Sequence, residues 1–435
     1  MALTLMTSFC IITEPFPVNE VTGEWGTRDG AAALHRRVES STRNALAVGA
    51  MALGGFGIGT TEFAAMGLLP DIAADLGVTE PVAGHVIAAY ALGVVVGAPF
   101  IAAAFARVPR RALLIGLMVA FTVGNALSVF APTYGTLVAA RFLAGLPHGA
   151  FFGVAALVAA HLAGPQGRGR AVGRVLMGLS VANVVGVPLV TWLGAAMNWR
   201  YALGVVVLIG AVTVIALLAL LPSVDIPATN PLTELGALAR PQVWFALLTG
   251  VVGFGGMFAV YTYISTTLTS VSGLGAGSVP VALAIYGVGM TIGNVVGGRA
   301  ADRSVARSIA GSLIALVVLQ ALFSLFAPQP FAAVSLFFLI GLTASALVPA
   351  LQTRLMDVAG EAQTLAATLN HSALNIANAL GAFLGGAVIA AGWGYTAPAL
   401  VGSALAVAGL AVFAVGTLVA RRGARTVAEP VGGPR

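Results

Sequence analysis

The sequence predicts an all-α membrane protein of twelve transmembrane helices in two six-helix halves, with both termini in the cytoplasm. Of its 435 residues, 59% are hydrophobic and 8% are charged, and the mean hydropathy is +0.98. Soluble domains carry about a quarter charged residues, so this composition indicates a chain that lies in lipid. Apolar runs of the length that crosses a bilayer recur along the chain, and its two halves resemble each other in sequence.

Twelve apolar runs are long enough to cross a hydrocarbon core about 30 Å thick, which takes about 20 helical residues. They cover residues 44–69, 82–104, 112–131, 134–160, 171–193, 200–221, 242–268, 279–299, 308–327, 331–353, 364–391 and 397–420. The predicted organisation is a flexible cytoplasmic extension over 1–43, an N-terminal half over 44–221, a cytoplasmic linker over 222–241, a C-terminal half over 242–420 and a cytoplasmic tail over 421–435. An alternative is that translation begins later, for example at Val38.

The basic residues predict which side of the membrane each loop faces. All 21 are arginine, and 19 of them fall between spans on one side. Only Arg200 lies on the opposite side, and only Arg141 lies within a span. Because cytoplasmic loops are rich in arginine, we predict a multi-pass membrane protein whose arginine-rich loops and termini lie in the cytoplasm. The formal net charge of +6 then reflects topology, and no nucleic-acid partner is expected, since the arginines do not gather on one soluble face.

An internal repeat relates the two halves. Residues 90–111 align without gaps on residues 286–307, at an offset of 196. The aligned identities pair Tyr90, Gly93, Gly97, Ala104, Arg107 and Arg111 with Tyr286, Gly289, Gly293, Ala300, Arg303 and Arg307. Shorter matches pair residues 182–186 with 377–381 and residues 199–201 with 393–395. Two halves of like orientation are the parallel-repeat plan of a secondary transporter.

From about residue 44 to residue 420 the sequence resembles the major facilitator superfamily. That family carries a loop motif of the form G-x-x-x-D-R-x-G-R-R after the second helix of each half. The matching residues are Gly298, Asp302, Arg303 and Arg307 in the C-terminal half and Arg107, Arg110 and Arg111 in the N-terminal half. The resemblance implies that they form a cytoplasmic gate, in which the acid caps a helix end. The N-terminal copy has Ala106 in place of that acid, so only Asp302 can act in this way.

Other stretches are similar to the drug:proton antiporters with twelve spans, in the branch of arabinose-efflux permeases and chloramphenicol exporters. They are residues 61–71, residues 97–111 and the segment R-F-L-A-G-L-P-H-G-A-F-F at 141–152. Gly178, Gly186 and Pro188 loosely match the family's motif in the fifth helix. Glycine permits close helix contact and proline removes a backbone hydrogen bond, so we expect a bend and tight packing there. Small-residue packing with no role in transport direction is the alternative.

Two charged residues lie within predicted spans and are candidates for proton coupling. At 1.5 Å per residue, Glu62 and Arg141 both lie about 10 to 12 Å below the outer boundary, so they can meet. We interpret Glu62 as a proton carrier whose proton affinity falls when Arg141 approaches. Arg141 also falls on the family's fourth-helix arginine, and His148, two turns further on, could relay a proton. The alternatives are a static buried ion pair and a neutral, hydrogen-bonded histidine.

Polar and aromatic residues within the spans are candidates to line a substrate cavity. The predicted set is Phe63, Asn125, Phe152, Asn183, Tyr261, Asn294 and Asn378. A mainly apolar wall suits a hydrophobic solute and offers few of the directional hydrogen bonds that a sugar needs. Helix-to-helix hydrogen bonding and contact with lipid are the alternative roles of such residues.

The resemblance implies a multi-pass protein of the bacterial cytoplasmic membrane. We therefore predict a monomeric transporter that exports a small, hydrophobic, drug-like compound in exchange for protons. The proton gradient is the energy source, the bilayer and the small-molecule substrate are the partners, and no cofactor or metal is expected. An enzyme is not predicted, because the sequence has no nucleophile with its base, no phosphate-binding loop and no metal-ligand spacing. The alternative function is a proton-independent facilitator or importer of a sugar or a nucleoside.

Overall fold

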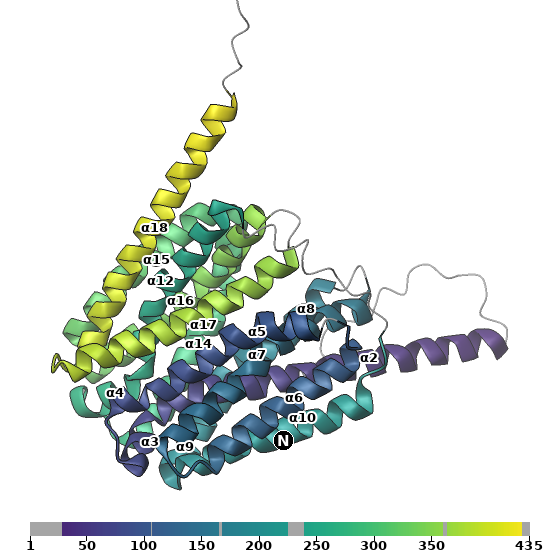
Figure 1. Cartoon of the computed structure of the whole chain (residues 1–435), viewed down its shortest axis with the longest axis horizontal. Coiled ribbons are helices and arrows are strands. Elements are labelled where there is room, and N and C mark those ends of the chain that lie inside the picture. Colours follow the sequence, from purple (N-terminus) through teal and green to yellow (C-terminus); the bar gives the residue numbers. More distant parts are fainter. Residues whose placement is uncertain (1–27, 106, 165–167, 225–238, 360–362, 429–435) are drawn as a thin grey trace, which may run out of the picture.

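A computed structural model describes residues 28–105, 107–164, 168–224, 239–359 and 363–428 of the chain (Figure 1). Within these ranges the regular structure is helical, with no strand. Among the described residues, twelve segments are long and apolar enough to cross a membrane, which confirms the predicted number. The all-α fold with twelve membrane-spanning helices is therefore the predicted one, and the twelve segments divide into two sets of six. The cytoplasmic placement of both termini stays a prediction.

The first six spans form the N half. Its elements are α2 (Arg28–Gly67), α3 (Leu69–Leu76), α4 (Glu80–Ala83), α5 (His85–Ala104), α6 (Arg110–Val129), α7 (Tyr134–Ala163), α8 (Arg168–Val181), the π-helical turn η1 (Ala182–Gly186), α9 (Val187–Ala196) and α10 (Trp199–Leu220). The first helix begins at Arg28, before the predicted start at residue 44, because no glycine or proline interrupts residues 31–48. Residues 1–27 of the predicted extension lie outside the described residues.

The last six spans form the C half. Its elements are α12 (Pro241–Thr262), α13 (Ile264–Thr266), the π-helical turn η3 (Thr267–Val271), the 3-10 turn η4 (Ala276–Ser278), α14 (Val279–Arg303), α15 (Val305–Phe326), α16 (Pro330–Ala359), α17 (Gln363–Ala390) and α18 (Ala397–Ala428). Residues 225–238 of the predicted linker and 429–435 of the predicted tail lie outside the described residues.

Local sequence explains several helix starts. Thr133 and Thr136 form a capping box at the start of α7, in which each side chain serves the other residue's backbone N–H. The side chain of Asn198 accepts from the backbone N–H of Arg200 and caps α10. These caps allow short, sharp connections between consecutive spans.

The two halves meet at one end, which we call the outer end. It carries α3, α4 and residues 391–396, and the arginine distribution predicts that it faces away from the cytoplasm (Figure 1). Here α4 and α5 pack on α17, and α14 packs on η1 and α9. The approach of α14 is close, because a Cβ on Gly287 would overlap the backbone carbonyl of Asn183.

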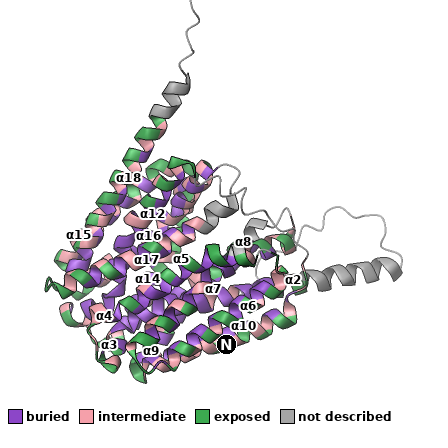
Figure 2. Ribbon diagram, viewed as in Figure 1, coloured by how far each residue is buried: buried purple, intermediate pink, exposed green. Residues whose placement is uncertain are grey.

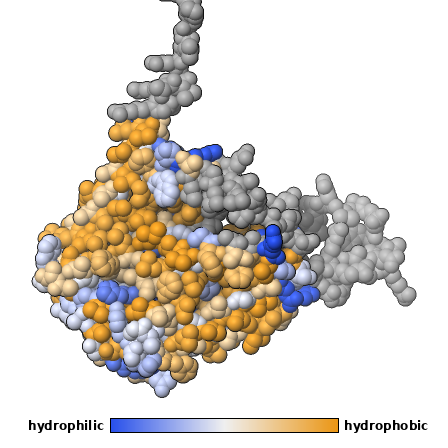
Figure 3. Space-filling view, viewed as in Figure 1, coloured by the Kyte–Doolittle hydropathy of each residue, from blue (hydrophilic) through white to orange (hydrophobic). Residues whose placement is uncertain are grey.

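The outward faces of both halves are apolar. Large aliphatic side chains are exposed on α10 and α15, among them Leu208, Ile215, Ile314 and Val318. Buried residues lie between the helices, whereas exposed ones cover their outward faces (Figure 2), and much of this surface is hydrophobic (Figure 3). A water-soluble monomer rarely exposes so large an apolar surface, so these faces are suited to acyl chains.

Candidate functional site

Glu62 lies on α2 at the contact between the two halves. Its side chain is buried, with 7% of the residue exposed. The carboxylate oxygen Oε1 accepts a long hydrogen bond of 3.5 Å from Nδ2 of Asn378, which belongs to α17 in the opposite half. Glu62 forms no ion pair within the described part of the chain. A charge change on this carboxyl therefore acts directly on a contact between the halves.

Arg141 on α7 binds the residue next to Glu62. Its Nη1 donates to the hydroxyl of Thr61 over 2.9 Å, and its Nη2 donates to the Thr61 carbonyl over 3.1 Å. The Thr61 hydroxyl in turn donates to Oδ1 of Asn125, 2.6 Å away. The guanidinium also lies 4.4 Å from the ring centre of Tyr90 on α5. The structure thus brings Arg141 to the level of Glu62 without an ion pair between the two.

A chain of contacts leads from Arg141 to the C half. The hydroxyl of Tyr90 is 3.1 Å from Nδ1 of His148, so the predicted relay residue lies beside the residue that stacks on Arg141. The His148 ring is 5.5 Å from that of Phe152, which stacks in parallel on His371 of α17 at 6.0 Å. Sequence reasoning missed Tyr90 and His371 as site residues. The recurrence of Tyr90 in the internal repeat was a signal that could have identified the first.

Three of the predicted cavity residues gather around Glu62. Phe63 meets Tyr261 edge to face at 5.4 Å between ring centres. It also stacks on Phe258 at 6.2 Å, and Phe258 and Tyr261 both belong to α12 of the C half. These rings form an aromatic contact between the halves next to Glu62, whose carboxylate accepts from Asn378. Apolar walls with few polar groups are typical of a site for a hydrophobic solute.

The other predicted cavity residues lie elsewhere. Asn125 is enclosed within the N half, where it binds Thr61 and donates to the carbonyl of Phe121. Asn183 lies on η1 and its Nδ2 donates to the Leu179 carbonyl, while its buried Oδ1 has no hydrogen-bond partner among the described residues. Asn294 is exposed on α14 and does not join the buried cluster. Sequence places all three within spans but does not fix which face of its helix each side chain occupies.

The predicted motif of the fifth helix lies at an irregular turn. The π-helical turn Ala182–Gly186 ends two residues before Pro188, which cannot donate a backbone hydrogen bond. Gly178 and Gly186 allow α2 to approach, since a Cβ on Gly178 would overlap the carbonyl of Ala52 and one on Gly186 would overlap the hydroxyl of Thr60. The glycines therefore set how closely the fifth span approaches the helix that carries Glu62.

The predicted cytoplasmic gate residues lie at the inner end and do not bridge the halves. Arg110 and Arg111 begin α6, and Arg111 donates to the Leu218 carbonyl of its own half. Ser304, rather than Asp302, caps α15 by accepting from the backbone N–H of Arg307. The remaining predicted members of this gate are Arg107, Gly298 and Arg303. Among the described residues, none of the seven forms an ion pair, so the expected acid latch is not made in this conformation.

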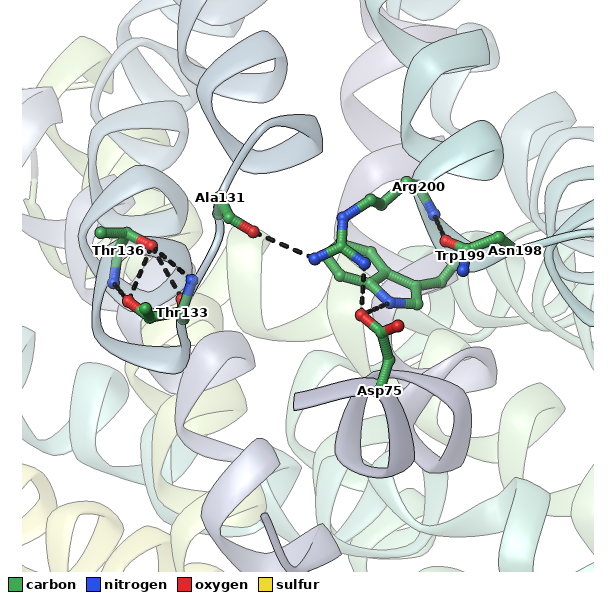
Figure 4. Close-up of polar contacts among 7 residues, drawn as sticks. All are labelled: Asp75, Ala131, Thr133, Thr136, Asn198, Trp199 and Arg200. Carbon is green, nitrogen blue, oxygen red and sulfur yellow. Dashed lines mark hydrogen bonds and ion pairs between the residues drawn. The ribbon is translucent and has the colours of Figure 1, made fainter. Parts of the chain in front are cut away.

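The outer end carries a polar cluster that joins three elements of the N half (Figure 4). Asp75 on α3 accepts from the indole Nε1 of Trp199 at 3.1 Å and forms an ion pair with Arg200. Arg200 also donates to the carbonyl of Ala131, just after α6. The hydrogen bond from Arg200 lowers the pKa of the Asp75 carboxyl. By contrast, burial raises the pKa of Asp71 on the same short helix.

Comparison with known proteins agrees with the twelve-span helical fold. The sequence pattern of the Major Facilitator Superfamily matches residues 51–303 and 267–433. An inner membrane transport protein of Escherichia coli K12, YdhP, is 44% identical over 84% of this chain and 94% of its own length.

Two further relatives are also transport or resistance proteins. The putative transporter AraJ of Escherichia coli K12 is 32% identical over 83% of this chain and 92% of its own. The chloramphenicol resistance protein of Streptomyces lividans is 35% identical over 74% and 84%. Relatives of this kind are transporters rather than enzymes. The chain belongs to the major facilitator superfamily, in the branch that resembles drug:proton antiporters, and is a multi-pass transport protein of the bacterial cytoplasmic membrane.

Proposed function

We propose that this transporter exports a small, largely hydrophobic, drug-like compound in exchange for protons, working as a monomer. The observation that carries the proposal is the Glu62 carboxyl, which is buried at the contact between the halves and hydrogen-bonded to Asn378 across it. Proton binding at such a position changes the charge that the moving halves must enclose. The proton gradient can therefore drive the change of conformation.

The end at which the two halves contact each other determines which state of the transport cycle the structure represents. The halves contact each other at the outer end, while the described gate residues at the inner end make no bond between them. We take this arrangement as the inward-facing state. Glu62 releases its proton to the inside, substrate enters beside Phe63, and rocking of the halves carries it to the outer face. Protonation of Glu62 from outside then returns the empty carrier.

The substrate class follows from the surroundings of Glu62. Phe63, Phe258 and Tyr261 form an aromatic contact between the halves beside Glu62, and the Asn378 amide donates to its carboxylate. A polyhydroxylated sugar would lose hydration at such walls without replacing it, whereas a flat apolar solute loses little. The chloramphenicol resistance protein among the relatives is in line with this class.

The test compares Glu62→Gln with the parent chain and with Asp357→Asn, which neutralises an exposed acid on α16. In everted vesicles holding a pH gradient, adding chloramphenicol or another compound from a susceptibility panel should release protons in the parent and in the control. We expect at least about a tenfold loss of this signal in Glu62→Gln, because the carrier can no longer exchange a proton. Equal signals in all three proteins would refute the proton-carrier role.

A second measurement separates export from the alternative function. Labelled arabinose or uridine that equilibrates across vesicles regardless of an imposed pH gradient would support the proton-independent facilitator or importer. Accumulation of a drug only with the gradient, together with its loss in Glu62→Gln, supports antiport.

A further inference from the structure

The outer end is closed by direct packing between the two halves. The hydroxyl of Tyr263, just after α12, donates to the carbonyl of Ala382 on α17. A Cβ on Gly84 in the N half or on Gly386 in α17 would lie only 2.5 Å from that hydroxyl oxygen. The Cβ on Gly386 would also contact the backbone of Pro81. Only glycine at these two positions leaves room for the halves to meet.

Glu80 lies in the middle of this closure. It is the first residue of α4, and its side chain is partly buried. Its Oε2 accepts a short hydrogen bond of 2.5 Å from the hydroxyl of Thr266 on α13, and the hydroxyl of Tyr395 also donates to the carboxylate. Both donors belong to the C half, so a single acid of the N half binds two separate elements of its partner half.

We propose that Glu80 is a proton-sensitive latch of the outer gate. The ionised carboxylate accepts from both hydroxyls, and hydrogen bonds to a charged acceptor are about twice as strong as those between neutral groups. A proton on the carboxyl removes the charge and turns one oxygen into a donor, which competes with Thr266 and Tyr395. Acid at the outer face therefore weakens the latch and favours opening on the side from which protons are taken up.

Among the described residues, hydroxyl groups are the side-chain hydrogen-bond donors to the Glu80 carboxylate. From the C half, Tyr395 and Tyr263 are the titratable groups that face it. The neighbouring α3 supplies Asp75, which is paired with Arg200, and the exposed Asp71. On the N-half side, Nδ1 of His85 lies 3.0 Å from the Tyr134 hydroxyl. In the described part of the chain no basic side chain forms an ion pair with Glu80, so its own protonation decides the strength of the latch.

The latch is independent of the carrier residue. Glu62 contacts α17 through Asn378, whereas Glu80 contacts α13 and the segment before α18. The inference goes beyond the proposed export function and holds whichever compound is carried. It can be tested in Glu62→Gln, where the proposed proton carrier is absent.

The experiment measures how readily a thiol behind the gate reacts. In a Cys10→Ser, Glu62→Gln background, Ser265→Cys places a buried thiol beside Thr266. The exposed Ala276→Cys in the same background serves as the reference, because it corrects for the effect of pH on thiol chemistry. A charged methanethiosulfonate reagent is applied in nanodiscs at about pH 8 and about pH 4, on either side of the ordinary pKa of a glutamate side chain.

We expect the normalised reaction rate of Ser265→Cys to rise about tenfold between the higher and the lower pH, because a charge-assisted hydrogen bond is lost. Adding Glu80→Gln should give the high rate at both pH values. Adding Thr266→Val should raise the rate at the higher pH by removing one donor while leaving the acid in place. A rate in Glu80→Gln that matches the parent, or that keeps its full pH dependence, would overturn the latch. Loss of export in Glu62→Gln leaves this readout unaffected.

Discussion

The outer ends of the two halves use the same repeated segment in different ways. Trp199, Arg200 and Tyr201 of the N half correspond in the repeat to residues 393–395 of the C half. In the N half, Trp199 is buried and, with Arg200, binds Asp75 of the same half, while Tyr201 is exposed. In the C half the pattern is reversed, because Trp393 is 69% exposed and Tyr395 reaches Glu80 in the other half.

One substitution within the repeat accounts for much of this difference. Gly394 stands where the N half has Arg200, and its φ of 80° is a conformation that favours glycine. Because glycine has no side chain, the C half has no equivalent of the ion pair that Arg200 forms with Asp75 in the N half. Its segment is instead held by Thr267, whose hydroxyl donates to the Tyr395 carbonyl. The two halves thus share the same arrangement of helices but differ in their polar contacts. In the N half these contacts join elements of the same half, whereas in the C half Tyr395 binds Glu80 of the N half.

The largest effect is expected from filling the space that allows the halves to close. Gly84→Val would force bulk against the Tyr263 hydroxyl, which also binds Ala382. The conformation in which the outer end is closed should then not form. Transport in vesicles should fall more than tenfold although the protein folds. Gly116→Val on α6, where an added Cβ meets nothing within 4 Å, is the matched control and should transport normally. Normal transport by Gly84→Val would show that this contact is not needed for closure.

The number of membrane-spanning helices could be predicted from sequence, because the length of an apolar run is read directly from the order of residues. The orientation that the arginines indicate stays a prediction. The depth of Glu62 and Arg141 followed from the rise per residue. The actual partner of Arg141 is Thr61, one residue earlier, and neighbouring side chains on a helix point about 100° apart. Span boundaries uncertain by several residues cannot fix that rotation, so the ion pair between Glu62 and Arg141 could be expected but not tested by sequence.

Glu80 escaped prediction for a different reason. It lies just outside the predicted second span, where an acid is ordinary and gives no signal. Its importance arises from Thr266 and Tyr395, which are more than 180 residues away in the chain. Such contacts depend on how the two halves pack. The same applies to Asn294, which the span pattern grouped with Asn378 although only the latter reaches Glu62.

An effect of intermediate size is expected from replacing Tyr395 but not from replacing Tyr201, its counterpart in the repeat. Tyr395→Phe removes one donor to Glu80, which at about 1 kcal/mol should shift the balance between closed and open outer ends about fivefold. Tyr201→Phe changes the exposed counterpart and should have no effect. Reaction of the buried Ser265→Cys thiol measures both. Equal effects of the two substitutions would mean that the halves do not differ in the way described.

The smallest effect is expected from the Asp75–Arg200 ion pair, which contributes to the stability of the N half. Because Arg200 holds the pKa of Asp75 below its ordinary value, the ionised form is favoured in the folded state, and this contribution is present above about pH 4. It is lost as pH falls through the lowered pKa. The pair is partly exposed, with side-chain exposures of 30% and 35%, so solvent screening limits it to about 0.5 kcal/mol. Asp75→Asn should therefore lower thermal stability slightly at neutral pH and not under acid conditions.

Asp71 on the same short helix is expected to have the opposite effect on the stability of the folded state. Burial raises its pKa, so its ionised form opposes folding at neutral pH, and that cost is relieved as pH falls through the raised value. Asp71→Asn should leave stability unchanged or raise it slightly near pH 7, where Asp75→Asn lowers it. Unfolding in detergent can be followed by the fluorescence of Trp199, which donates directly to Asp75. If both substitutions shift stability in the same direction, the Arg200 contact is not what distinguishes the two acids, and the N half is fastened by apolar packing alone.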